Sequence, residues 1–155
     1  MNEAKRSVRE IDHTADLGFE VEAAEPADLF KLAGEAFYGL IADAAGIEPK
    51  EEIKISAAAE NWEELLHTWL CELLAQFNLK GFIGKQCDIT TMEGVGNPEF
   101  KTPDPLSVRV EAIVKGEALD LNRHKFHTEI KGVTYHGFRV WQEGGMWHAR
   151  VIFDV

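Results

Sequence analysis

Cysteines and long apolar runs are both scarce in this chain of 155 residues. The two cysteines, Cys71 and Cys87, form no CxxC pair, so neither a zinc ribbon nor a disulfide framework is expected. We predict two inert thiols in a reducing, cytoplasmic setting. No apolar run reaches the about 18 residues that a membrane-spanning helix needs, and residues 1–10 lack the apolar core of a signal peptide.

Basic residues are also few. The chain has 16 Lys and Arg against 27 Asp and Glu, which gives a formal net charge of −11. Binding to a phosphate backbone draws its affinity from clustered cations, so we expect no direct nucleic-acid binding. The length and an apolar fraction of 45% are those of one globular domain, which we place at residues 1–155.

Two amphipathic helices are predicted from apolar residues at three- and four-residue steps. The first begins near Pro26, which suits a first helical turn, and Gly46 is its stop signal. The second follows a capping box formed by Asn61 and Glu64, and Gly81 ends it.

The rest of the chain is typical of strands, around residues 7–11, 17–23, 53–57, 82–93, 106–114, 133–143 and 146–154. Gly144 and Gly145 predict a hairpin turn between the last two strands, and residues 94–105 predict an exposed loop. The order ββαβαββββ favours an α+β fold. We expect the two helices to pack on one face of a mainly antiparallel β-sheet.

Residues 13–16, with the sequence HTAD, lie between two predicted strands where the chain must turn. Asp and Thr often stabilise such turns by bonding to backbone amides, so a structural role is one interpretation and a functional site is the other.

Residues 121–139 form a basic segment with a local net charge of +3, since they hold four Lys or Arg and one acid. This segment is either a docking surface for an anion or an acidic partner, or a solvated basic hairpin. It also contains His124, His127 and His136, but an HxxH pair without further ligands is weak evidence for zinc.

The chain ends on an alternating strand pattern. Asp154 beside the terminal carboxylate of Val155 would offer several hard oxygen donors, a start for a Ca²⁺ or Mg²⁺ site if one more carboxylate comes close. The alternative is a short strand with a solvated end.

Four motifs in this order resemble those of the archease family, whose members assist the RtcB-type RNA ligase in tRNA splicing and RNA repair. They are HTAD at 13–16, LLHTWLCELL at 65–74, the segment from His124-Lys125 to the strand IKGVTYH at 130–136, and IFDV at 152–155. The resemblance covers nearly the whole chain and implies an α+β fold in which the first and last motifs are adjacent.

The resemblance also implies a divalent-metal site made by Asp16, Asp154 and Val155, the last through its terminal oxygens. An all-oxygen donor set favours a hard cation, here Ca²⁺, Mg²⁺ or Mn²⁺. His13, Lys125, Lys131 and His136 are the expected supporting or partner-contacting residues.

The implied function is that of a non-enzymatic accessory protein. It would promote guanylylation and repeated turnover of an RtcB-type ligase, so the chemical nucleophile would belong to the partner. Two other hypotheses remain open: a metal-dependent phosphohydrolase that uses the same carboxylates with His13 or His136 as general base, and a chaperone-like protein-binding module.

Overall fold

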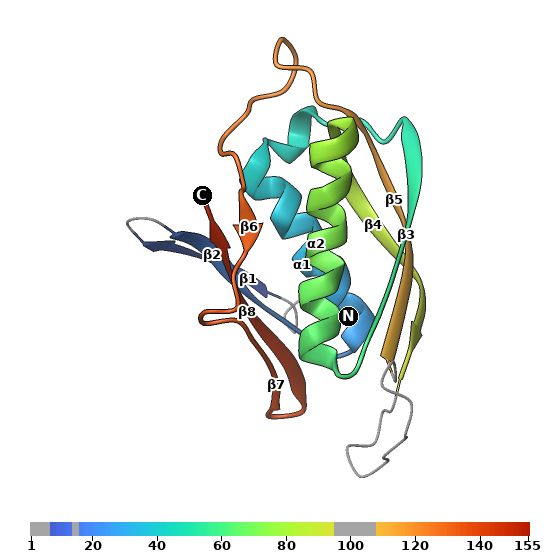
Figure 1. Cartoon of the computed structure of the whole chain (residues 1–155), viewed down its shortest axis with the longest axis vertical. Coiled ribbons are helices and arrows are strands. Elements are labelled where there is room, and N and C mark those ends of the chain that lie inside the picture. The colour runs from blue at the N-terminus through green and yellow to red at the C-terminus, as the bar shows by residue number, and fades with distance from the viewer. Residues whose placement is uncertain (1–6, 14–15, 95–107) are drawn as a thin grey trace.

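A computed structural model describes residues 7–13, 16–94 and 108–155 of the chain (Figure 1). The elements, in order, are β1 (Ser7–His13), β2 (Asp16–Ala23), α1 (Pro26–Ile41), the 3₁₀ turn η2 (Ala44–Gly46), β3 (Glu51–Ala59), α2 (Trp62–Lys80), β4 (Phe82–Glu93), β5 (Val108–Ala118), β6 (Gly132–Val133), β7 (Arg139–Glu143) and β8 (Met146–Asp154). Neither helix in this described part is long and apolar enough to cross a membrane.

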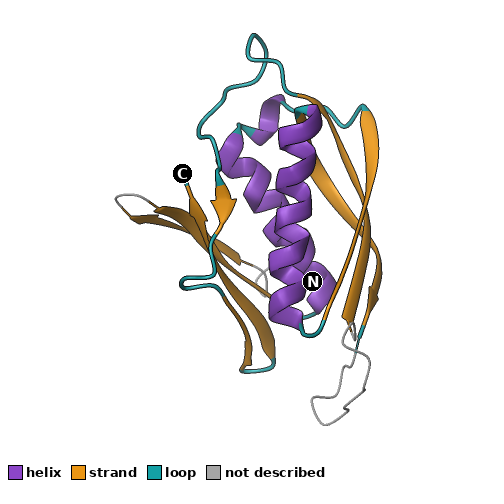
Figure 2. Cartoon of the chain, viewed as in Figure 1, coloured by secondary structure: helices purple, strands orange, loops and turns teal. Residues whose placement is uncertain are grey.

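The strands form two antiparallel sheets, and both helices lie between them (Figure 1, Figure 2). The larger sheet has the order β1-β2-β8-β6, with β7 also paired to β8, and the smaller sheet has the order β3-β5-β4. The predicted α+β class with antiparallel strands is confirmed. We expected one sheet with both helices on one face, whereas the structure has two sheets with the helices between them. Alternation identifies a strand's buried face but not the sheet to which the strand belongs.

The helix boundaries follow the predicted local signals. Pro26 occupies the start of α1, and the Asn61 side chain accepts a hydrogen bond from the Glu64 amide at the start of α2. Gly81 ends α2 in the left-handed conformation, with φ of 65°. Helix α1 ends at Ile41, earlier than its predicted stop signal, because Gly46 instead closes the separate turn η2.

Buried aromatic side chains pack the larger sheet against helix α1. Phe153 of β8 is fully buried, and its ring centroid lies 5.6 Å from those of Phe19 and Phe37. Successive side chains of a strand point to opposite faces, so the burial of Phe153 directs its neighbour Asp154 outward. The core therefore sets the orientation of the last acidic residue of the chain.

The basic segment at 121–139 is not the predicted hairpin. Within this segment only Gly132 and Val133 form a strand ahead of β7. The chain between β6 and β7 turns through Gly137, whose φ is 74°. The hairpin predicted at Gly144 and Gly145 is confirmed, and it joins β7 to β8. The loop predicted at 94–105 lies, apart from Gly94, outside the described residues.

Candidate metal centre

Asp16 and Asp154 are direct partners on the neighbouring antiparallel strands β2 and β8. Directly opposed residues carry their side chains on the same face of the sheet, with Cβ atoms about 4.5–5.5 Å apart. That face is the outer one, because Phe153 beside Asp154 points into the core. The register thus brings together two carboxylates that are 138 positions apart in the sequence (154 − 16).

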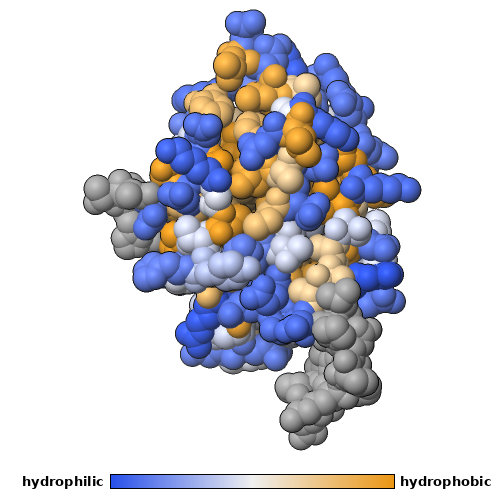
Figure 3. All heavy atoms as spheres, viewed as in Figure 1, coloured by the Kyte–Doolittle hydropathy of each residue, from blue (hydrophilic) through white to orange (hydrophobic). Residues whose placement is uncertain are grey.

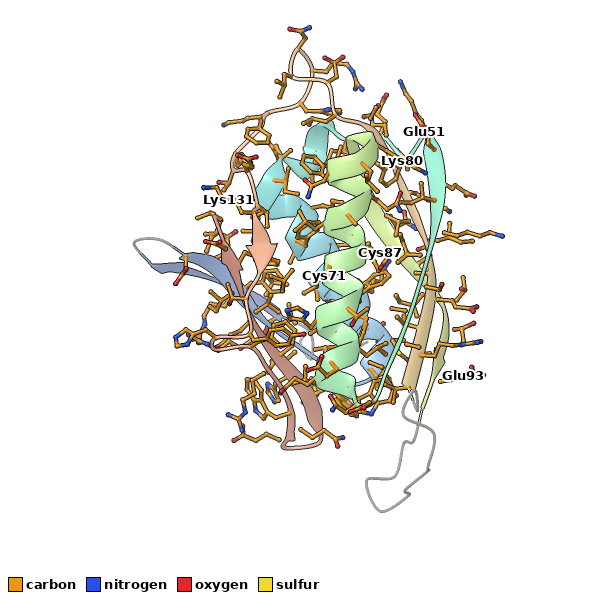
Figure 4. All side chains as sticks on the ribbon, in the orientation of Figure 1. Glu51, Cys71, Lys80, Cys87, Glu93 and Lys131 are labelled. Carbon is orange, nitrogen blue, oxygen red and sulfur yellow. The ribbon has the colours of Figure 1, made fainter. Side chains whose placement is uncertain are left out.

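The Asp16–Asp154 pair has a paired residue on each side of it in the larger sheet. On β1, His13 pairs with Asp16, although only the backbone of His13 is described. On the other side of β8, Gly132 of β6 pairs with Asp154, and the Lys131 amide donates to the Asp154 carbonyl oxygen at 2.7 Å. Figure 4 shows Lys131 on the segment that leads into β6, beside the end of the chain. Val155, the residue after Asp154, is partly buried and packs against the core.

In the described part of the chain, neither the Asp16 nor the Asp154 side chain takes part in a hydrogen bond or an ion pair. Asp154 is exposed and Asp16 is half-buried. Two carboxylates on directly opposed residues repel each other, less strongly where water screens them. A bound cation would replace this repulsion with attraction.

The donor set fits a hard divalent cation. Carboxylate and main-chain oxygens are the ligands of Ca²⁺ and Mg²⁺, and neither cation requires sulfur or imidazole. No group of three or more His, Cys, Asp or Glu side chains able to hold a metal occurs among the described residues. A site at Asp16 and Asp154 therefore needs further donors, and the main-chain oxygens of Val155 are the nearest along the chain.

Two of the predicted supporting residues, Lys125 and His136, lie on segments whose backbone is held by hydrogen bonds away from the carboxylate pair. The Lys125 carbonyl accepts a hydrogen bond from the Asp43 amide at 3.0 Å, which ties Lys125 to the end of α1. The exposed His136 lies in the turn after β6, and its carbonyl accepts from the Thr134 hydroxyl at 3.1 Å. Neither side chain has a described contact with the carboxylate pair.

A buried polar cluster anchors the segment that carries Lys125 and Lys131. Glu117 at the end of β5 accepts from the Glu48 amide at 2.7 Å, from Arg123 at 2.5 Å and from His124 Nε2 at 2.9 Å. These donors, the Glu48 amide first, lower the pKa of Glu117 to about 2. The His124 ring is fully buried and bonded at both nitrogens, so it is a structural residue rather than a metal ligand.

A second anchor involves His67 of α2. The His67 ring stacks on Tyr135 with centroids 3.8 Å apart, and its Nε2 lies 3.0 Å from the Val133 carbonyl oxygen of β6. The motif analysis does not single out Glu117 or His67. Each is a polar residue that the structure buries, and no local sequence pattern marks that burial.

Comparison with known proteins gives consistent results over nearly the whole chain. The model of the Archease protein family matches residues 9–155. Protein archease of Methanopyrus kandleri is 38% identical over 146 residues, which cover 94% of this chain and 97% of that protein. Protein archease of Archaeoglobus fulgidus is 32% identical over 147 residues, which cover 95% and 98%.

Two solved structures share the fold. The solution structure of Methanobacterium thermoautotrophicum protein 1598 has a TM-score of 0.75 and 25% identity, covering 96% of this chain and 98% of that one. A crystal structure from Thermotoga maritima, described as an archease and possible chaperone, has a TM-score of 0.58 and 22% identity, covering 94% of each chain.

Proposed function

The chain belongs to the archease family, and from this membership and the Asp16–Asp154 pair we propose that it is a non-enzymatic activator of an RtcB-type RNA ligase. The observation that carries the proposal is the register of β2 and β8, which opposes Asp16 to Asp154 at the end of the chain. Two acids held together without a described counter-charge are suited to binding a divalent cation.

The Asp16 and Asp154 carboxylates and the main-chain oxygens of Val155 would hold the cation. A divalent cation neutralises phosphate charge during nucleotidyl transfer, which is the chemistry that the site would supply to the ligase. Lys131 is exposed and lies one residue before the partner of Asp154, and we propose that its ammonium group contacts the ligase near the cation. His13, His136 and Lys125 are the further residues proposed to support the site or meet the ligase.

The net charge of −11 agrees with a partner that is a protein rather than bare RNA. In this account the nucleophile that accepts the guanylyl group belongs to the ligase. This chain's residues bind the cation and present it at an exposed edge of the larger sheet.

Titration calorimetry with Ca²⁺, Mg²⁺ and Mn²⁺ tests the metal site. Asp16→Asn and Asp154→Asn should each weaken binding at least about 10-fold, because each removes one of two charged donors. Glu22→Gln is the matched control, since Glu22 also lies on β2, on the same outer face, but contacts His148. Equal affinity in the wild type and both Asn variants would contradict the site.

A guanylylation assay with the cognate RtcB-type ligase tests the activator role. The wild-type protein should increase the guanylylated fraction of the ligase, and Asp154→Asn should not. Lys131→Ala should reduce the stimulation, whereas Lys54→Ala on the other sheet should leave it unchanged. Nucleotide hydrolysis by the isolated protein that disappears in Asp16→Asn would instead favour the phosphohydrolase hypothesis.

A chaperone-like role is the second candidate, because the molecule exposes large apolar side chains. Of the five exposed in the described part of the chain, four lie on α2 or the segment from 119 to 138: Leu79, Leu121, Phe126 and Tyr135. Apolar residues also gather over α2 on the face in Figure 3. A contiguous exposed apolar patch marks a site of protein contact, and the apolar residues over α2 are the candidate patch.

Aggregation of an unrelated protein, measured by light scattering, separates the two candidates. A chaperone would suppress it equally with and without EDTA, and Leu79→Ser and Leu121→Ser together would remove the effect. A ligase activator of the kind proposed would leave the aggregation unchanged.

A further inference from the structure

Strand β6 is only two residues long, yet it forms one flank of the Asp154 backbone. Beside its two paired residues, Gly132–Asp154 and Val133–Phe153, three hydrogen bonds attach it to β8. The Lys131 amide donates to the Asp154 carbonyl at 2.7 Å, and the Thr134 amide and hydroxyl donate to the Ile152 carbonyl at 3.1 and 3.2 Å. A two-residue strand has too few ladder bonds to be stable alone. Contacts outside the sheet therefore contribute to its position.

Helix α2 provides such contacts through the buried His67 and, at the surface, through Glu64 and Glu63. The Tyr135 hydroxyl donates to Glu64 at 3.3 Å and the Val140 amide donates to Glu63 at 3.0 Å. The His67 Nε2 lies 3.0 Å from the Val133 carbonyl oxygen of β6. Its ring is parallel to Tyr135 within 8°, with centroids 3.8 Å apart, and Phe138 meets it edge-on at 5.2 Å. One buried ring thus contacts the residue that ends β6 and two side chains of the turn that follows.

The hydrogen-bonding pattern fixes the tautomer of His67. A carbonyl oxygen only accepts, so Nε2 carries the proton and donates it to Val133. In the neutral ring Nδ1 is then an acceptor, and it faces the Cys71 sulfur one helical turn away at 3.6 Å. Because His67 is only 7% exposed, water cannot readily replace it as the donor to Val133.

We propose that His67 is a positioning residue for the carboxylate pair: by holding Val133 and Tyr135 on α2, it keeps β6 paired with β8 and so fixes the backbone of Asp154. This inference rests on the proposed function, because it assigns the support of the same metal site. His67 touches neither Asp16 nor Asp154, and it acts through β6 alone.

The consequence of losing the His67 contacts follows from the strand order of the larger sheet. Without β6, the end of β8 would pair with β2 on one side only, and residues 152–155 would lie at a free sheet edge. Fraying at such an edge would let Asp154 and Val155 move away from Asp16. Cation binding would then have to order these residues at the time of binding, which lowers affinity.

Variants of three residues distinguish a specific effect of the His67 contacts from a general loss of stability. His67→Leu removes the donor and the stack. Tyr135→Ala removes the stack from the other side together with the Tyr135–Glu64 hydrogen bond, which Tyr135→Phe removes alone. His67→Gln is the conservative variant, since its amide nitrogen can still donate to Val133. Ile55→Val trims the core beneath the smaller sheet and is the control for a loss of stability away from β6.

Two measurements are made on each variant: amide hydrogen exchange at Lys131 and Thr134 by NMR, and Ca²⁺ affinity by calorimetry. His67→Leu and Tyr135→Ala should speed exchange at both amides by about 10-fold and weaken Ca²⁺ binding by about 10-fold. His67→Gln should retain most of the affinity, and Ile55→Val should match the wild type in both measurements.

The outcomes distinguish this inference from the proposed function. If the wild type binds Ca²⁺ and Asp16→Asn does not, but His67→Leu exchanges and binds as the wild type does, the positioning role is wrong and the metal site stands. Faster exchange and weaker binding in Ile55→Val to the same extent would also overturn it. If the wild type itself binds no cation, the proposed metal site fails, and the positioning role fails with it.

Discussion

The Glu117 cluster should make an acid-sensitive contribution to stability, and Glu117→Gln tests it. The carboxylate accepts from the Glu48 amide, Arg123 and His124, and its side chain is 5% exposed. A glutamine has one accepting oxygen, and its NH₂ group would face one of these donors. The substitution therefore removes a charge and creates a donor–donor conflict at a buried position.

The expected loss can be worked out from the pKa of Glu117. Folding lowers it from 4.5 to about 2, which corresponds to at most about 3–4 kcal/mol at about 1.4 kcal/mol per pKa unit. The Arg123 side chain is 43% exposed, so water screens part of this attraction and we expect about 2 kcal/mol. For a domain of this size that is a decrease in Tm of about 4–8 °C.

Urea unfolding of the wild type and Glu117→Gln across a range of pH is the assay. Because folding depresses the pKa, the stabilisation is complete above about pH 4.5 and disappears as the pH falls toward about 2. Glu111→Gln on the same strand is the control, and the loss of its exposed ion pair with Arg109 should cost under about 0.5 kcal/mol. A loss equally small for Glu117→Gln near neutral pH, or one that persists undiminished at about pH 3, would refute the reasoning.

Two further predictions concern close packing. A Cβ at Gly18 would collide with the Val151 carbonyl oxygen across β2 and β8, so Gly18→Ala should destabilise the protein by about 2–3 kcal/mol in urea unfolding and weaken Ca²⁺ binding. Gly39→Ala on α1, where nothing lies within 4 Å, should instead stabilise it by about 0.5–1 kcal/mol, and a loss comparable to that of Gly18→Ala would contradict the packing argument. Burial raises the pKa of both the Cys71 and the Cys87 thiol, so alkylation followed by mass spectrometry should be slow at Cys71 and require unfolding at Cys87. Fast labelling of Cys87 in the native protein would be inconsistent with its burial.

The features that the sequence predicts well are those with local causes. Asn61 and Gly81 mark the ends of α2 because capping and left-handed turns depend on a few adjacent residues. The hairpin at Gly144 and Gly145 is predictable for the same reason, since its turn needs positive φ at both glycines. The family resemblance is confirmed by the match over residues 9–155.

The features that the sequence does not reveal depend on contacts between distant segments. Alternation in β2 and β8 predicts two strands but not their pairing, so the approach of Asp16 to Asp154 follows from the resemblance and not from the pattern. Glu117 falls on the outward-facing positions of β5, yet the segment after that strand buries it. His67 bonds to a carbonyl 66 positions away, a contact that no local pattern encodes.

The central claim is that this protein activates an RNA ligase through a cation held at Asp16 and Asp154. Its most direct test is the number of RNA ends joined per molecule of the cognate RtcB-type ligase, measured with excess RNA and limiting ligase. We predict that the wild-type protein raises this number above one while Asp154→Asn, folded to the same degree by circular dichroism, does not. Equal product per ligase molecule with the wild type, with the variant and with no added protein would contradict the account.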